Sequence, residues 1–61
     1  MTYHAEAIWA ETRTGFNEAL ESTIARADKE AQAHFSAVED LSVNPVPVGN
    51  GWAAVVVWST I

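Results

Sequence analysis

The segment that decides the fold is Trp52-Ala53-Ala54-Val55-Val56-Val57-Trp58-Ser59-Thr60-Ile61. Its β-branched and aromatic residues are typical of a β-strand, in which successive side chains point to opposite faces. Two sets of side chains result, with Trp52, Ala54, Val56 and Trp58 on one face and Ala53, Val55, Val57 and Ile61 on the other. Both sets are apolar, and a strand that is apolar on both faces has to be covered on both faces. The sequence therefore predicts a central strand with a layer on each side.

The segment from Phe16 to about His34 has the period of an α-helix. Its apolar residues recur at steps of three or four and form one stripe, made of Phe16, Leu20, Ile24, Ala27 and Ala31. Either Thr12 or Thr14 can cap this helix by accepting a hydrogen bond from a free backbone N–H. One helix can cover only one face of the last strand, so the second layer is expected from another copy of the chain.

Two further strands are expected, from Tyr3 to Glu11 and from Phe35 to Val43. In the second of them, alternation predicts one face with Phe35, Ala37, Glu39 and Leu41 and the other with Ser36, Val38, Asp40 and Ser42. Pro45 and Pro47 lack the N–H that a central strand needs, which predicts an edge strand that ends in an extended arm. The residues Gly49-Asn50-Gly51 are typical of a hairpin turn.

Together these segments predict one domain, residues 1–61, of the α+β class with the order β-α-β-β. The first two strands are expected to run parallel, joined through the helix by a right-handed crossover. The third strand then fits antiparallel between them, which gives one helix on a three-stranded antiparallel sheet of order 1-3-2. This order places the doubly apolar strand in the centre and the strand with the prolines at an edge.

The composition favours assembly. The chain has 61 residues, 49% of them hydrophobic, and no cysteine, so neither disulfides nor zinc–thiolate sites can stabilise so small a domain. We therefore expect a homo-oligomer. The net charge is −5 with only three basic residues, which argues against nucleic acid or an anionic membrane as a partner. With no signal peptide and no run of roughly 20 apolar residues, the expected location is cytoplasmic.

No pattern typical of a catalytic or metal site stands out. The chain has no combination of serine, histidine and acid with usable spacing, and no glycine-rich phosphate loop. His4 and His34 lie 30 residues apart, and isolated histidines are usually structural or solvated. Glu39 and Asp40 would hold a divalent ion only on a symmetry axis, and a solvated acidic edge is the favoured interpretation. We expect neither enzymatic activity nor a bound metal.

Three short motifs resemble those of the dodecins, a family of small flavin-binding proteins. Gly15-Phe16-Asn17-Glu18-Ala19-Leu20 and Ile24-Ala25-Arg26-Ala27 are similar to the family's Ser-Phe-x-x-Ala-Ile and Ile-x-Arg-Ala. Phe35-Ser36-Ala37-Val38-Glu39-Asp40 resembles the segment with which the family's second strand begins. The resemblance covers most of the chain. It implies a hollow dodecamer with flavins stacked at the junctions between subunits.

The resemblance also implies which residues would contact the ligand. Phe35 stands where the family has a stacking tryptophan, and Trp52 stands where a glutamine commonly binds the flavin ring. Trp58 shares a strand face with Trp52 and could stack on an aromatic ligand, although packing in an interface is the favoured interpretation for both. The candidate ligand-binding residues are Phe35, Asp40, Trp52 and Trp58, and the candidate cofactor is a flavin (FMN, FAD or riboflavin).

The sequence thus predicts a dodecin-like homo-oligomer that binds and stores a flavin or another planar aromatic ligand. An alternative from a different class is a small acidic protein–protein interaction module that docks a basic partner and binds no small molecule. A third interpretation is a shell-like oligomer that has lost its ligand site. The visible absorbance of a bound flavin in the purified protein would separate the first interpretation from the other two.

Overall fold

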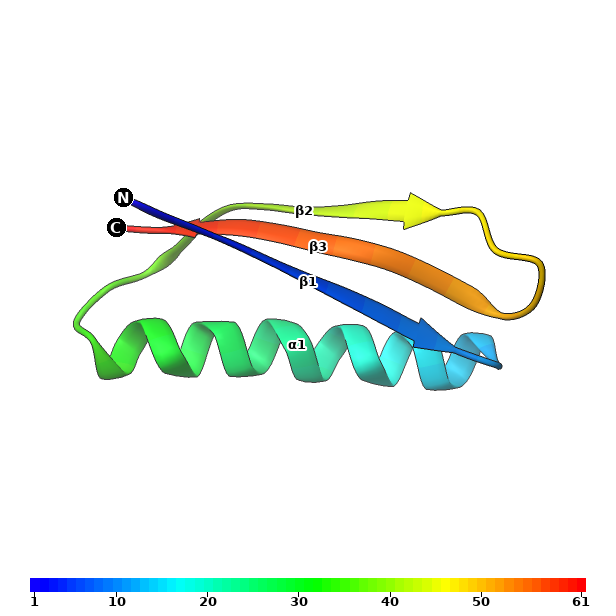
Figure 1. The fold of residues 1–61 in the computed structure, drawn as a ribbon. Coiled ribbons are helices and arrows are strands. Elements are labelled where there is room, and N and C mark those ends of the chain that lie inside the picture. The colour runs from blue at the N-terminus through cyan, green and yellow to red at the C-terminus, as the bar shows by residue number, and fades with distance from the viewer.

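Strand β3 (Trp52–Thr60) is the centre of a three-stranded antiparallel sheet, with β1 (Thr2–Ala10) on one edge and β2 (Val38–Val46) on the other. The computed structural model describes all 61 residues. The single helix, α1 (Arg13–Ala33), packs across one face of the sheet (Figure 1). The strand order β1-β3-β2 and the element order β-α-β-β confirm the predicted α+β fold. The helix is too polar to cross a membrane.

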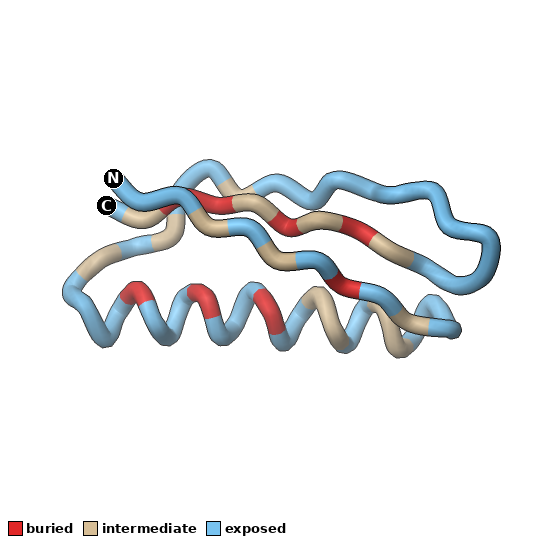
Figure 2. Tube along the Cα trace, viewed as in Figure 1, coloured by how far each residue is buried: buried red, intermediate tan, exposed pale blue.

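The core lies between α1 and the sheet (Figure 2). Its buried apolar residues come from β1, α1 and β3 and are Ile8, Ala27, Ala54, Val56 and Trp58. Half-buried Phe16 and Leu20 from the helix and Val38 and Leu41 from β2 pack around them. Only 8 of the 61 residues are buried, so the interior of one copy is small for a chain that is 49% hydrophobic.

The face of the sheet turned away from α1 has no layer over it, and we call it the open face (Figure 1). The strand register places twelve residues on it: Tyr3, Ala5, Ala7 and Trp9 of β1, Ala53, Val55, Val57 and Ser59 of β3, and Glu39, Ser42, Asn44 and Val46 of β2. In its centre, Val55 and Val57 are only half-buried. The central strand is therefore apolar on both faces but covered by this chain on one.

The helix begins three residues earlier than the sequence predicts, at Arg13, with Thr12 as its N-cap. The backbone of Thr12 is extended (φ −117°, ψ 156°), and its Oγ1 accepts a hydrogen bond from the Gly15 N–H at 3.1 Å. Of the two candidate caps, the structure selects this one. The predicted stripe is wrong at Ile24, which is exposed, whereas Thr23 is buried. Successive helical residues are about 100° apart, so only one of these two neighbours can face the sheet.

Strand β2 departs most from the prediction, because it begins at Val38 and runs on to Val46. A bulge between Glu39 and Ser42 inserts an extra residue, with Asp40 at a φ of 52°. The predicted alternation is therefore wrong: Val38 and Leu41, expected on opposite faces, both pack against the core. Pro45 lies within the strand, opposite Ala54, as an edge strand permits.

The hairpin turn between β2 and β3 packs against the end of β1. Gly51 has a φ of 83°, and a Cβ placed there would lie 2.5 Å from the carbonyl oxygen of Ala10. The indole of Trp9 lies beside the same glycine and donates a hydrogen bond from its Nε1 to the Asn50 carbonyl at 3.2 Å. Glycine is therefore required at position 51 both for the backbone conformation and for space.

The cap of α1 yields a stability prediction. Thr12→Ala removes the acceptor for the Gly15 N–H and should lower the free energy of unfolding by about 1 kcal/mol. Thr14→Ala, a matched control in the first turn, should leave it nearly unchanged. Chemical denaturation followed by circular dichroism measures both. Equal effects of the two substitutions would contradict the assignment of the cap.

Candidate functional site

Most aromatic side chains of this protein are not in its core. Of the six, Trp58 alone is buried, with 7% of its surface exposed. Phe16 is half-buried, and four remain exposed: Tyr3 at 73%, Trp9 at 55%, Phe35 at 101% and Trp52 at 47%. Large exposed aromatic surface is typical of sites that contact a partner or a planar ligand.

Phe35 follows the C-terminus of α1 and lies outside β2, contrary to the prediction that it starts a strand. The helix ends in a Schellman motif, in which the Ser36 N–H bonds to the Ala31 carbonyl at 2.8 Å. The Phe35 N–H bonds to the Gln32 carbonyl at 3.1 Å, and Phe35 itself takes the left-handed conformation with φ 55°. Glycine is the usual residue at this point of the motif.

The conformation of Phe35 is strained and is not stabilised by packing of its ring. A bulky residue with positive φ is an outlier, and the left-handed region costs roughly 1–2 kcal/mol for an L-residue. The ring is fully exposed, so contacts within one copy do not offset this cost. Strained backbone of this kind concentrates at functional sites.

Trp52 lies at the opposite end of the molecule, where α1 begins. Its ring is tilted against Phe16, with 6.4 Å between the ring centroids. The guanidinium carbon of Arg13 lies 5.7 Å from the centroid of the indole, in cation–π geometry. A half-exposed indole beside a guanidinium can stack on a planar ring and attract an anionic group attached to it.

Trp58 is stacked on His4, with ring centroids 5.4 Å apart and an interplanar angle of 14°. The Nε2 of His4 lies 3.2 Å from the Thr60 hydroxyl oxygen, at hydrogen-bonding distance. Trp58 and Trp52 share the helix-facing side of β3, as predicted. Trp58 lies six positions after Trp52, about 20 Å along the strand, so within one copy they cannot contact the same small ligand.

Asp40 lies in the bulge of β2 with an exposed side chain. Neighbouring Glu39 is on the open face, and its carbonyl accepts a hydrogen bond from the Ser59 hydroxyl at 3.1 Å. No three side chains of the histidine, aspartate and glutamate type lie close enough together to hold a metal ion. The four candidate residues thus lie toward the two ends of one copy: Phe35, Trp58 and Asp40, which is across the bulge from Trp58, toward the end of α1, and Trp52 near its start.

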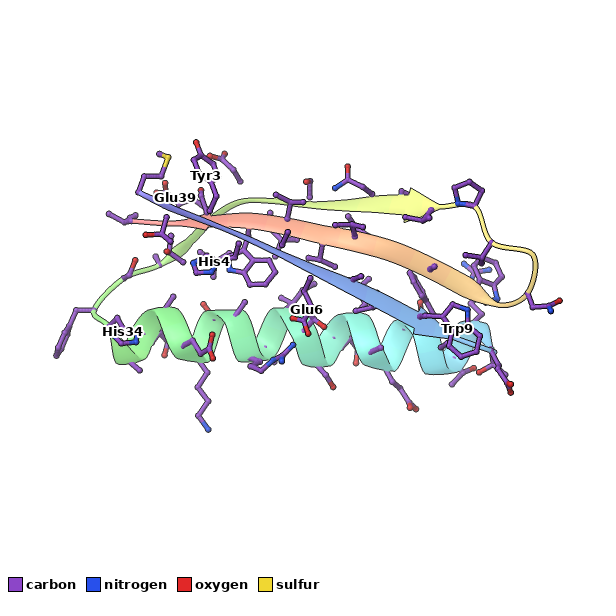
Figure 3. The ribbon with its side chains drawn as sticks, in the orientation of Figure 1. Tyr3, His4, Glu6, Trp9, His34 and Glu39 are labelled. Carbon is purple, nitrogen blue, oxygen red and sulfur yellow. The ribbon has the colours of Figure 1, made fainter.

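The structure also brings together two residues that the sequence left apart. His4 and His34 both line a cleft of about 450 Å³ between the C-terminal end of α1 and the sheet. Figure 3 shows His4 in the space between β1 and the helix, whereas Tyr3 points to the open face. The sequence signal for this cleft is weak, because its walls are alanines and its polar groups come from four separate segments.

One ion pair connects the helix to the sheet. Arg26 donates to Oε1 of Glu6 at 2.6 Å, and this hydrogen bond, with the opposite charge, raises the pKa of Arg26 above its usual value. Both side chains are open to solvent, so the pair serves mainly to orient β1 on α1. It also occupies one of the three basic residues of the chain.

Comparison of this chain with family models, with curated proteins and with solved structures finds no match. The assignment of a function therefore depends on the geometry described above.

The strain at Phe35 yields a second prediction. Phe35→Gly should raise the free energy of unfolding of a single copy by about 1 kcal/mol, because glycine adopts the left-handed conformation without steric cost. Phe35→Ala keeps the strain and removes only an exposed ring, so its effect on a single copy should be close to zero. Denaturant titration at high dilution measures both variants. A loss of stability in Phe35→Gly would show that the ring is needed for folding.

Proposed function

We propose that this protein is a homo-oligomer that binds a small planar aromatic ligand, with a flavin as the first candidate, at junctions between its copies. The observation that carries the proposal is the exposure of four of the six aromatic side chains in one copy. Stacking between aromatic rings supplies binding energy without any bond chemistry, so the expected role is storage or sequestration.

The open face supports association with a second copy. Each copy has a net charge of −5, and like-charged molecules repel least where they meet at an uncharged surface. Glu39 is the sole charged residue of the twelve on the open face, and it lies at one end. The centre, around Ala7, Val55 and Val57, is uncharged. A second copy lying on this face would shield the apolar side of β3 and enlarge a core that has only 8 buried residues.

Junctions between copies also offer a way to complete the ligand site. Phe35 and Trp52 are at opposite ends of one copy, and each leaves a ring surface open. A planar ligand between two copies can stack on an exposed ring from each of them. Arg13, which lies over Trp52, would favour a ligand with a phosphate, such as FMN or FAD, over riboflavin.

The assembly is tested by the mass of the protein in solution. We expect a mass well above the 6.6 kDa of one copy. Val55→Lys places a charge in the centre of the open face and should lower the mass, while the copy stays folded because nothing in it packs over that face. Ser22→Lys adds the same charge to the exposed side of α1 and should leave the mass unchanged. Light scattering and circular dichroism measure the two effects, and a wild-type protein that is folded and monomeric at high concentration contradicts the proposal.

Ligand binding is tested by titration with FMN and riboflavin, using the quenching of flavin fluorescence that accompanies stacking. Phe35→Trp should tighten binding through its larger ring, and Phe35→Ala should weaken it about ten-fold, the loss of one stacking contact. Val48→Ala, an exposed apolar residue of the hairpin loop, is the control and should bind as the wild type does. If the protein is an oligomer but quenches the fluorescence of neither flavin, the assembly stands and the flavin ligand is refuted. That result would favour the protein-interaction module.

A further inference from the structure

The cleft at the C-terminal end of α1 is separate from the exposed aromatic residues that carry the proposed function. Its floor is formed by the small side chains of Ala27 and Ala31, and its roof by the stacked pair of Trp58 and His4. Toward the rim it is lined by polar residues, namely Thr2, Glu30, His34, Ser36 and Thr60. A volume of about 450 Å³ lies within the range of small-molecule sites, about 300–1,000 Å³.

The cleft lies where small residues of the helix face the sheet, toward the C-terminal end of α1. In Figure 1, β1 approaches α1 at the start of the helix and lies well away from it at the other end. Alanine side chains at positions 27 and 31 do not reach across this space. The indole of Trp58 and the imidazole of His4 fill part of it and leave the remainder open.

The electrostatics of the cleft favour a positive charge. The C-terminal end of a helix carries a partial negative charge, and the last turn of α1 contains no basic residue that would offset it. Glu30 lines the cleft and forms no ion pair; its charge also acts on Arg26, which is itself paired with Glu6. Neither lysine nor arginine lines the cleft, and its basic side chains are the imidazoles of His4 and His34.

The aromatic roof favours a positive charge as well, through the part of it that the stack of His4 on Trp58 leaves open to the cleft. The face of an indole attracts cations, and organic ammonium groups bind to aromatic surfaces more readily than strongly hydrated metal ions do. Hydroxyl groups at the rim add acceptors: the Thr60 hydroxyl is near His4, and the Ser36 hydroxyl donates to the Ile61 carbonyl at 2.8 Å, which leaves its lone pairs free.

We propose that this cleft is a binding site for a small organic cation, an amine or a quaternary ammonium compound. The cation lies under Trp58 and His4, with its charge toward Glu30 and the end of α1. The site is independent of the flavin proposal, since it uses no exposed aromatic ring and lies within one copy.

The probe for this site is choline, compared with its neutral isostere in which a quaternary carbon replaces the nitrogen. The full chain is titrated with each compound, and backbone and indole N–H signals are followed by NMR. We expect choline to bind with a dissociation constant on the order of a millimolar, because so few non-hydrogen atoms supply little binding energy. It should bind at least several-fold more tightly than the isostere, which has no charge. The largest shifts should be at the Trp58 indole and at residues of the last turn of α1.

Two variants separate the charge from the shape of the cleft. Glu30→Gln keeps the size of an exposed side chain and should weaken choline binding about two- to five-fold. Glu18→Gln makes the same change near the other end of α1 and should have no effect. The proposal is overturned if the isostere binds as well as choline, if Glu30→Gln changes nothing, or if the shifts occur at Trp9 and Trp52 instead. Binding of Zn²⁺ to the two histidines without binding of choline would likewise overturn it.

Discussion

The structure depends on how β3 is covered. Its backbone is hydrogen-bonded on both edges, to β1 and to β2, so its amide groups are satisfied within one copy. Its two faces are not covered equally. The helix α1 buries Ala54, Val56 and Trp58 on one face, and no layer of this copy covers Val55 and Val57 on the other. The acidic residues of the chain are kept off the centre of the open face, and toward its C-terminal end the helix presents small side chains to the sheet.

The two ends of the helix–sheet layer differ because the helix presents different residues to the sheet along its length. Near its start, Phe16 and Arg13 meet Trp52, and β1 lies close to the helix. Near its end, the residues that face the sheet are Ala27 and Ala31, which leave room for the stacked pair of His4 and Trp58 and for a cleft beside it. On the helix-facing side of β3, the indole at one end, that of Trp52, is therefore half-exposed, and the indole at the other end, that of Trp58, is buried.

The sequence predicted the fold because the fold depends on period and on the positions of proline and glycine. The helical stripe, the apolar last strand, and Pro45 at an edge together lead to one strand order, and the structure has it. The details of β2 were missed for a physical reason. Two residues, Phe35 and Asp40, take left-handed backbone conformations without being glycine, and each shifts the side-chain pattern that follows. Strict alternation starting at Phe35 therefore assigned Val38 and Leu41 to opposite faces.

The candidate site was less predictable, because its members meet only through long-range packing. Sequence reasoning found the aromatic residues but not their exposure, which depends on whether α1 reaches them. It set the two histidines aside as 30 residues apart, although the register of β1 against β3 and the end of α1 bring both to one cleft. No local pattern marks such a site.

Phe35 and Asp40 show how backbone strain can be used to distinguish a structural residue from a functional one. Aspartate is among the residues that tolerate the left-handed region, and its position in a bulge of an edge strand accounts for its conformation. Phenylalanine has no such tolerance, and glycine is the usual residue at the left-handed position of a Schellman motif. The ring of Phe35 is fully exposed, so no contact within one copy offsets the free-energy cost of its backbone conformation. A large apolar side chain that is both strained and fully in water is best explained by a contact made with a second molecule.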